Sequence, residues 1–212
     1  MLPSTTLFLG TTASLAIIHT FLGVDHSLPF VALARAREWS LTRTLFVTFL
    51  CGVGHVASSV GIGLFGIGLG ITTESMLWLE SARGEFAASL LLGFGFAYAA
   101  WAMWRRIRSQ ESSQHSGFQS VTPWALFIVF VLGPCEPLIP LMVVPGLQGD
   151  WFGVAAVVSV FGFLTITVMM ATVAAAYRGV GVITKRGFGP YSDVAAGLVV
   201  AASGAAVLWF GL

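Results

Sequence analysis

The chain has 212 residues, of which 57% are apolar by type and only 9% are charged. A soluble domain carries roughly 25% charged residues, so this composition excludes an ordinary soluble protein and predicts a polytopic protein embedded in a lipid bilayer. The sequence has no basic cluster with interleaved aromatic residues, and we therefore expect no nucleic-acid partner.

Six apolar segments can be separated at prolines, glycines and charge clusters, each close to the ~20 residues that cross a bilayer. The N-terminus has no basic region before its first apolar run, so we expect that run to be a retained span and not a cleaved signal peptide. The predicted spans are Thr5–Ala34, Thr44–Ile71, Glu85–Trp104, Thr122–Val144, Phe152–Tyr177 and Tyr191–Leu212.

The first predicted span is interrupted between Gly23 and Pro29, and it holds His19, Asp25 and His26. A charge at membrane depth costs roughly 2–3 kcal/mol or more and usually lines a path or a binding site. In a continuous helix His19 and His26 would share a face, while Asp25 would be displaced around the axis. A break at Gly23 would swing Asp25 back toward the two histidines.

The second predicted span carries His55 in a Gly-Val-Gly-His stretch, where small neighbours let another backbone approach. We expect Cys51, in the same span, to be a small buried hydrophobic residue. Neither Cys51 nor Cys135 belongs to a CxxC pair, so the sequence gives little reason to expect a structural disulfide.

The fourth predicted span contains Pro134, Pro137 and Pro140 together with Cys135 and Glu136. Each proline removes a backbone donor and crowds the preceding turn, so we expect the helix to break here. A broken helix at membrane depth is tolerated where it borders a cavity lined by protein. This stretch is therefore a second candidate for a binding site.

The two interrupted segments can be aligned. Residues 22–30 match residues 132–140 without a gap, at an offset of 110 residues. The pairs are Asp25 with Cys135, His26 with Glu136 and, further on, His55 with Thr165. Paired discontinuous segments in two halves are typical of transporters, so we predict an internal duplication.

The Ser/Gln-rich stretch 109–121 has no apolar period and is expected to be a mobile connector on the cytoplasmic side. It divides the chain into a first repeat, 1–108, and a second repeat, 122–212, with three spans each. An odd number of spans makes the repeats inverted. The predicted fold is thus an all-α polytopic membrane protein with six transmembrane helices in two inverted three-helix repeats, of which helices 1 and 4 are broken.

Loop charges predict the orientation. Nine of the ten basic residues fall after the first, third and fifth spans, so the positive-inside rule makes those loops cytoplasmic and both termini outside. Arg83 is the exception and is expected in an outside loop together with Glu74, Glu80 and Glu85. We expect the inner (cell) membrane of a bacterium or archaeon. The glycine-rich faces of the second and third spans would serve a homodimer or internal packing.

Imidazole, thiolate and carboxylate are ligands that late first-row divalent ions prefer, whereas sodium or calcium favours all-oxygen sites. We expect His19 to act as an access group or a supporting group for the ligands. Nothing in the sequence suggests a catalysed covalent reaction or a resident cofactor. The predicted metal ligands are Asp25, His26, His55, Cys135 and Glu136.

His19…Asp25-His26 followed by Gly54-His55 resembles the signature of the nickel/cobalt transporter superfamily, which includes urease-accessory-type nickel permeases. Those proteins carry His-x4-Asp-His in one helix and Gly-His in the next, whereas five residues separate His19 from Asp25 here. The Gly-Pro-Cys-Glu-Pro stretch is similar to the Pro-Cys-Pro element of the resistance-type branch. The resemblance implies a membrane transporter for nickel or cobalt.

Two alternatives stay open. The same Pro-Cys stretch is similar to the thiol-disulfide membrane transporters of cytochrome-c biogenesis, which share a duplicated three-plus-three design but need a reactive cysteine in each half. Here Asp25 stands at the position that matches Cys135. The other alternative is an exporter of a small sulfur-containing anion, for which we expect a base at mid-membrane depth and find none in the predicted spans.

Overall fold

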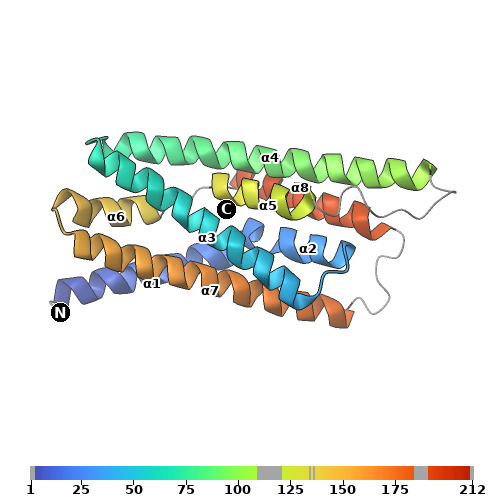
Figure 1. The fold of residues 1–212 in the computed structure, drawn as a ribbon, viewed down its shortest axis with the longest axis horizontal. Helices are drawn as coiled ribbons and strands as arrows, with labels where there is room; N and C mark the ends of the chain where they lie inside the picture. Colours follow the sequence, from blue (N-terminus) through green and yellow to red (C-terminus); the bar gives the residue numbers. More distant parts are fainter. Residues whose placement is uncertain (1–2, 109–120, 134, 136, 184–190, 211–212) are drawn as a thin grey trace.

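The computed structural model describes residues 3–108, 121–133, 135, 137–183 and 191–210, and every regular element among them is a helix (Figure 1). In chain order these are α1 (Pro3–Leu22), the 3-10 turn η1 (Val24–His26), α2 (Leu28–Ala36), α3 (Leu41–Gly68), α4 (Thr73–Arg108), α5 (Val121–Leu132), α6 (Leu138–Leu147), α7 (Trp151–Ile183) and α8 (Ser192–Phe210).

Four helices, α3, α4, α7 and α8, are long and apolar enough to cross a membrane. The α1 and α2 segments together can make a fifth span, bent by 75° at its break, while α5 and α6 are apolar but individually too short. Large apolar side chains such as Phe65, Phe152 and Phe163 lie on the outside, as expected of surfaces that contact lipid. The fold is therefore all-helical and compatible with an integral membrane protein, and the six-span inverted repeat stays a prediction.

Both expected helix breaks are present. Between α1 and α2 the chain makes a single 3-10 turn, and Pro29 lies in the first turn of α2. A continuous helix would need an N–H at residue 29 to reach the carbonyl of residue 25, and proline has none. The second break separates Leu132 from Leu138. It spans the proline-rich stretch for the same reason.

The predicted loop before the third span is wrong. Helix α4 begins at Thr73, so Glu80 and Arg83 lie inside the helix and not in an outside loop. The Arg83 guanidinium donates to the Glu80 carboxylate one turn earlier, at 2.9 Å. Charges that neutralise each other along one helix face need not mark its end, and the charge cluster was therefore misleading.

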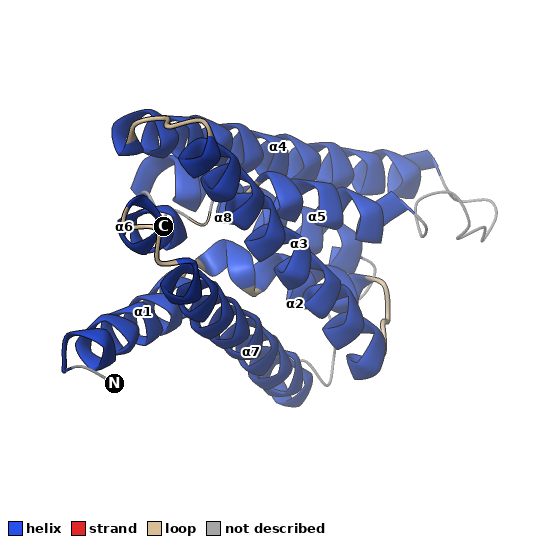
Figure 2. Ribbon diagram, turned by 60° about the vertical axis from the view of Figure 1, so that its left-hand side comes forward, coloured by secondary structure: helices blue, strands red, loops and turns tan. Residues whose placement is uncertain are grey.

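Two pairs of packed helices form the opposite edges of the molecule, and α3 crosses between them. Helix α4 forms one long edge and packs on α8, while α1 and α7 pack together at the opposite edge (Figure 1). Added Cβ atoms at Gly95, Gly197 and Gly204 would come within 2.3–2.6 Å of the facing backbone, so only glycine permits this α4–α8 approach. Helix α3 crosses between these edges and contacts α5, α6 and α7, as Figure 2 shows from a second direction.

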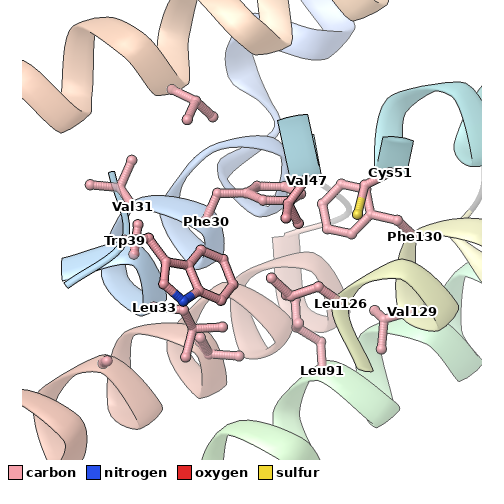
Figure 3. Packing of buried hydrophobic residues seen from close by; sticks show 14 of the residues in the cluster. Phe30, Val31, Leu33, Trp39, Val47, Cys51, Leu91, Leu126, Val129 and Phe130 are labelled. Atoms are coloured by element: carbon pink, nitrogen blue, oxygen red, sulfur yellow. The ribbon is translucent and has the colours of Figure 1, made fainter. Parts of the chain in front are cut away.

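The larger hydrophobic core includes residues of α2, which follows the first break, and of α5, which precedes the second break. Figure 3 shows its labelled members, which come from α2, α3, α4 and α5 and, in the case of Trp39, from the loop between α2 and α3. Phe30 of α2 and Phe130 of α5 lie with ring centroids 4.7 Å apart. Cys51 belongs to this core and Cys135 to a separate one, and both are buried free thiols. Phe130 also contacts the histidines described next.

Candidate metal centre

Three histidines from three elements meet inside the bundle. His19 comes from the last turn of α1, His26 from η1 and His55 from the middle of α3. Their ring nitrogens can all lie within 4.8 Å of one another. The His26 ring is 5.2 Å from the His19 ring and 5.3 Å from the His55 ring, centroid to centroid. His26 and His55 are each only 2% exposed.

The first break orients His26. Its Nδ1 lies 2.9 Å from a carboxylate oxygen of the neighbouring Asp25, so Nδ1–H donates, and in the neutral ring Nε2 keeps its lone pair. The backbone N–H of His26 donates to the Gly23 carbonyl, which closes the 3-10 turn. A Cβ at position 23 would lie 2.2 Å from His26 Nδ1, so the turn leaves room for nothing larger than glycine.

The second break orients His55. Its Nδ1 lies 3.3 Å from the carbonyl oxygen of Phe130 in α5, which can only accept, so Nδ1–H is the donor. In a continuous helix that carbonyl would accept from the N–H of residue 134, but proline has no N–H. It accepts instead from the N–H of Gly133, at 3.1 Å, and from His55. The proline-rich stretch thus supplies the acceptor that sets the tautomer of a histidine on another helix.

The Nε2 atoms of His19, His26 and His55 are buried and have no hydrogen-bond partner among the described residues. Buried polar atoms nearly always have a partner, so three orphaned nitrogens in one cluster require an explanation. Ligand atoms that lie about 2.1 Å from a tetrahedral ion are about 3.4 Å from one another. Small rotations of the three rings would therefore bring one nitrogen of each, now within 4.8 Å of one another, to the distances needed to bind one ion. The carboxylate on His26 matches the carboxylate–histidine–metal arrangement of protein metal sites.

The structure separates the predicted ligands. It brings His19, His26 and His55 together and sets Asp25 behind His26. The buried Cys135 is not part of this histidine group, and its backbone N–H donates to the Ser59 hydroxyl at 3.2 Å. Glu136 lies outside the described residues, and its predicted role stays a prediction.

Arg83 was not among the predicted site residues, although it supports the second break. Its guanidinium donates to the carbonyl oxygens of Leu132, at 3.0 Å, and of Gly133, at 2.6 Å. It also contacts the hydroxyls of Ser58 and Ser59 at 3.2 and 3.1 Å, and its side chain is 12% exposed. Proline at 137 cannot donate to the Gly133 carbonyl. This missing donor is visible in the sequence and predicts that a group from another helix donates to that carbonyl.

Comparison of the chain with protein-family models, with curated proteins and with solved structures gave no match. The chemistry of the histidine group therefore rests on its geometry. That geometry brings three imidazole rings together between the two helix breaks, and His26 and His55 among them are almost fully buried.

Proposed function

We propose that the protein transports a divalent transition-metal ion across a membrane, and that it is not an enzyme. One observation carries this proposal, namely that the rings of His19, His26 and His55 converge and that each has a buried Nε2 atom with no partner among the described residues. Neutral imidazole suits late first-row ions, whereas sodium, magnesium and calcium prefer oxygen. Nickel and cobalt are the substrates that the sequence resemblance favours. The ion is the cargo and not a resident cofactor.

A site between broken helices suits transport. The histidine group lies at the first break, and the end of the second break holds His55 through Phe130. In transporters, discontinuous helices meet at the substrate site, and alternating access comes from one repeat rocking against the other. The ion would exchange its water for imidazole on one side and leave when the two breaks move apart.

Helix pairing supports the inverted repeat as part of the proposal. Helix α1 packs on α7 and the matching α5 packs on α3, so each repeat sets its first segment against the middle helix of the other. The third helices, α4 and α8, pack on each other. The six-span count in a bacterial or archaeal inner membrane, both termini outside and a homodimer are further parts of this proposal.

Metal binding to the purified protein tests the proposal. Isothermal titration with nickel, cobalt and zinc should give micromolar or tighter binding to the wild-type chain, and His26→Ala and His55→Ala should each remove most of it. His115→Ala is the matched control because His115 is the one histidine remote in sequence from the group. Ion uptake into vesicles that contain the protein should then fall with the same variants.

Two outcomes would contradict the proposal: no binding by the wild-type protein, or loss of binding in His115→Ala as large as in His26→Ala. Cys135→Ser, a nearly isosteric change, separates the structural site from the wider predicted ligand set. Unchanged metal affinity in that variant would limit the ligands to the histidine group, whereas a large loss of affinity would show that the Cys135 thiol is also a ligand. Because imidazole must be neutral to bind, affinity should weaken as the pH falls.

No specific observation favours the two alternatives. Cys51 and Cys135 are each fully buried, in separate hydrophobic clusters, where a thiol is poorly placed for exchange with a partner. Arg83 does lie within a candidate span, but its guanidinium donates to the Leu132 and Gly133 carbonyls and to Glu80. A base engaged in this way is poorly available to a transported anion.

A further inference from the structure

A small cavity lies against His55, one member of the histidine group, on the side of α4 and α8. It has a volume of about 20 Å³ and is lined by Asp25 and His55, by Gly84, Ala87, Ala88 and Leu91 of α4, and by Val129, Phe130, Gly133 and Val207. A cavity needs about 10–15 Å³ to hold one water molecule. The space next to the site therefore has room for a single water-sized ligand.

Among the described residues of the lining, Asp25 and His55 are the ones with polar side chains. His55 is 2% exposed, and its Nε2 has no partner among the residues that the structure describes. The Asp25 carboxylate uses one oxygen on His26 Nδ1, yet its side chain is still 25% exposed. The second carboxylate oxygen is thus available to accept from a molecule in the cavity.

Three imidazoles do not complete the coordination of a divalent transition-metal ion. Such ions take at least four ligands, and sites with three protein ligands keep a water or a substrate in the remaining position. Ala87 and Ala88 leave free the volume that a larger residue in α4 would occupy. The cavity is where a fourth ligand fits without moving the backbone.

We propose, on the basis of the proposed function, that the bound ion keeps one water ligand, which occupies the cavity between η1, α3 and α4 and donates to Asp25. The ion then has one exchangeable position, on the α4 side, and three fixed ones. That position is where an incoming ligand first replaces the water, whereas release of the ion also requires the two breaks to move apart and the imidazoles to detach. The small residues of α4 set the size of what can replace the water.

Pulsed EPR on the copper(II)-loaded protein tests this arrangement, with copper(II) as a paramagnetic late first-row ion. Modulation from the remote imidazole nitrogens reports the histidine ligands, and deuterium modulation after exchange into D2O counts coordinated water. The wild-type protein should show imidazole nitrogen together with one coordinated water. Imidazole coordination without water would overturn the proposal, because no open position would exist.

Ala87→Val fills the cavity and should remove the deuterium signal of the coordinated water while the imidazole signals remain. Gly84→Ala is a second, smaller filling change in the same lining, in case the first variant does not fold. Ala97→Val is the matched control, since Ala97 lies on the exposed side of the same helix. Water retained in both filling variants would overturn the proposal. Failure of copper(II) to bind the wild-type protein at all would instead count against the proposed function.

Discussion

The break between α1 and α2 and the break between α5 and α6 begin alike, since each follows a Leu-Gly pair and precedes a proline. They are held in different ways. The first is closed from within, because Asp25 bonds to His26 and the Gly23 carbonyl accepts from the N–H of His26. The second is held from outside, because Arg83 of α4 donates to the Leu132 and Gly133 carbonyls.

This difference separates two uses of a broken helix. At the first break the side chains of the turn themselves provide the candidate ligand His26 and its orienting carboxylate. At the second break the freed backbone carbonyls matter most, since Phe130 holds His55 and the next carbonyls hold α5 against α4. The first break should therefore tolerate few changes to its own residues, whereas the second should depend on residues elsewhere in the chain.

The largest expected effect is on stability and comes from Arg83→Gln. This change removes the guanidinium that donates to the Leu132 and Gly133 carbonyls and to the fully buried Glu80 carboxylate. Breaking a buried ion pair costs about 3–5 kcal/mol in the free energy of unfolding. Thermal or denaturant unfolding in detergent measures the loss.

The double variant Glu80→Gln/Arg83→Gln is the control for that prediction. It should recover part of the lost stability, because the carboxylate that had lost its Arg83 partner is now neutral, while the carbonyls still lack the guanidinium. Wild-type stability in the single variant would show that the second break does not need its external support, and the contrast between the two breaks would fail.

Next in size is a matched pair of glycine substitutions at aligned positions. In Gly23→Ala the new Cβ would meet His26 Nδ1 at 2.2 Å and Asp25 Oδ1 at 3.0 Å, so His26 must leave its carboxylate. In Gly133→Ala the nearest atoms are the Phe130 carbonyl at 3.3 Å and His55 Nδ1 at 3.4 Å, which small shifts can relieve. Loss of an orienting partner costs about 10–100-fold in metal affinity.

We therefore expect Gly23→Ala to weaken metal binding about 10–100-fold and Gly133→Ala to change it only a few-fold. Calorimetric titration of both variants with the same ion makes the comparison. Equal losses of metal affinity in the two variants would mean that both breaks position the ligands in the same way, and the proposed difference between the breaks would be wrong.

The smallest expected effect is that of Asp25→Asn. The amide oxygen can still accept from His26 Nδ1–H, so the ring keeps its orientation and only the negative charge is lost. Affinity should fall about tenfold, at the low end of the range for a residue behind a ligand, and stability should change little. A loss as large as that of Gly23→Ala would indicate that Asp25 binds the ion directly.

The two helix breaks could be predicted from the sequence because their causes are local. A proline lacks its N–H wherever it lies, so Pro29 and the prolines after Gly133 interrupt a helix in any fold. Asp25 and His26 could be singled out for a similar reason, since ionisable groups in an apolar segment are costly in any membrane protein. Those rules need no knowledge of which helix packs on which.

Two features could not be predicted from such local rules. The charges near the start of α4 were interpreted as a loop, because the outside partners of Arg83 lie 49 and 50 residues away in sequence. The family pattern, with its four-residue spacing, left His19 as an access or supporting group. The 3-10 turn at Gly23 brings its ring to 5.2 Å from His26 and thus into the cluster.

The sequence by itself determined the composition of a membrane protein, the places where its helices break and a short set of residues able to bind a metal. The tertiary structure decided which of those residues meet, bringing together His19, His26 and His55, with Asp25 behind His26 and Cys135 apart from the group. The physical reason is that a missing N–H acts within a single turn, and that an ionisable group in an apolar segment is costly whatever the segment packs against. A ligand cluster, in contrast, requires side chains from separate helices to converge, and only the packing of those helices sets where they meet.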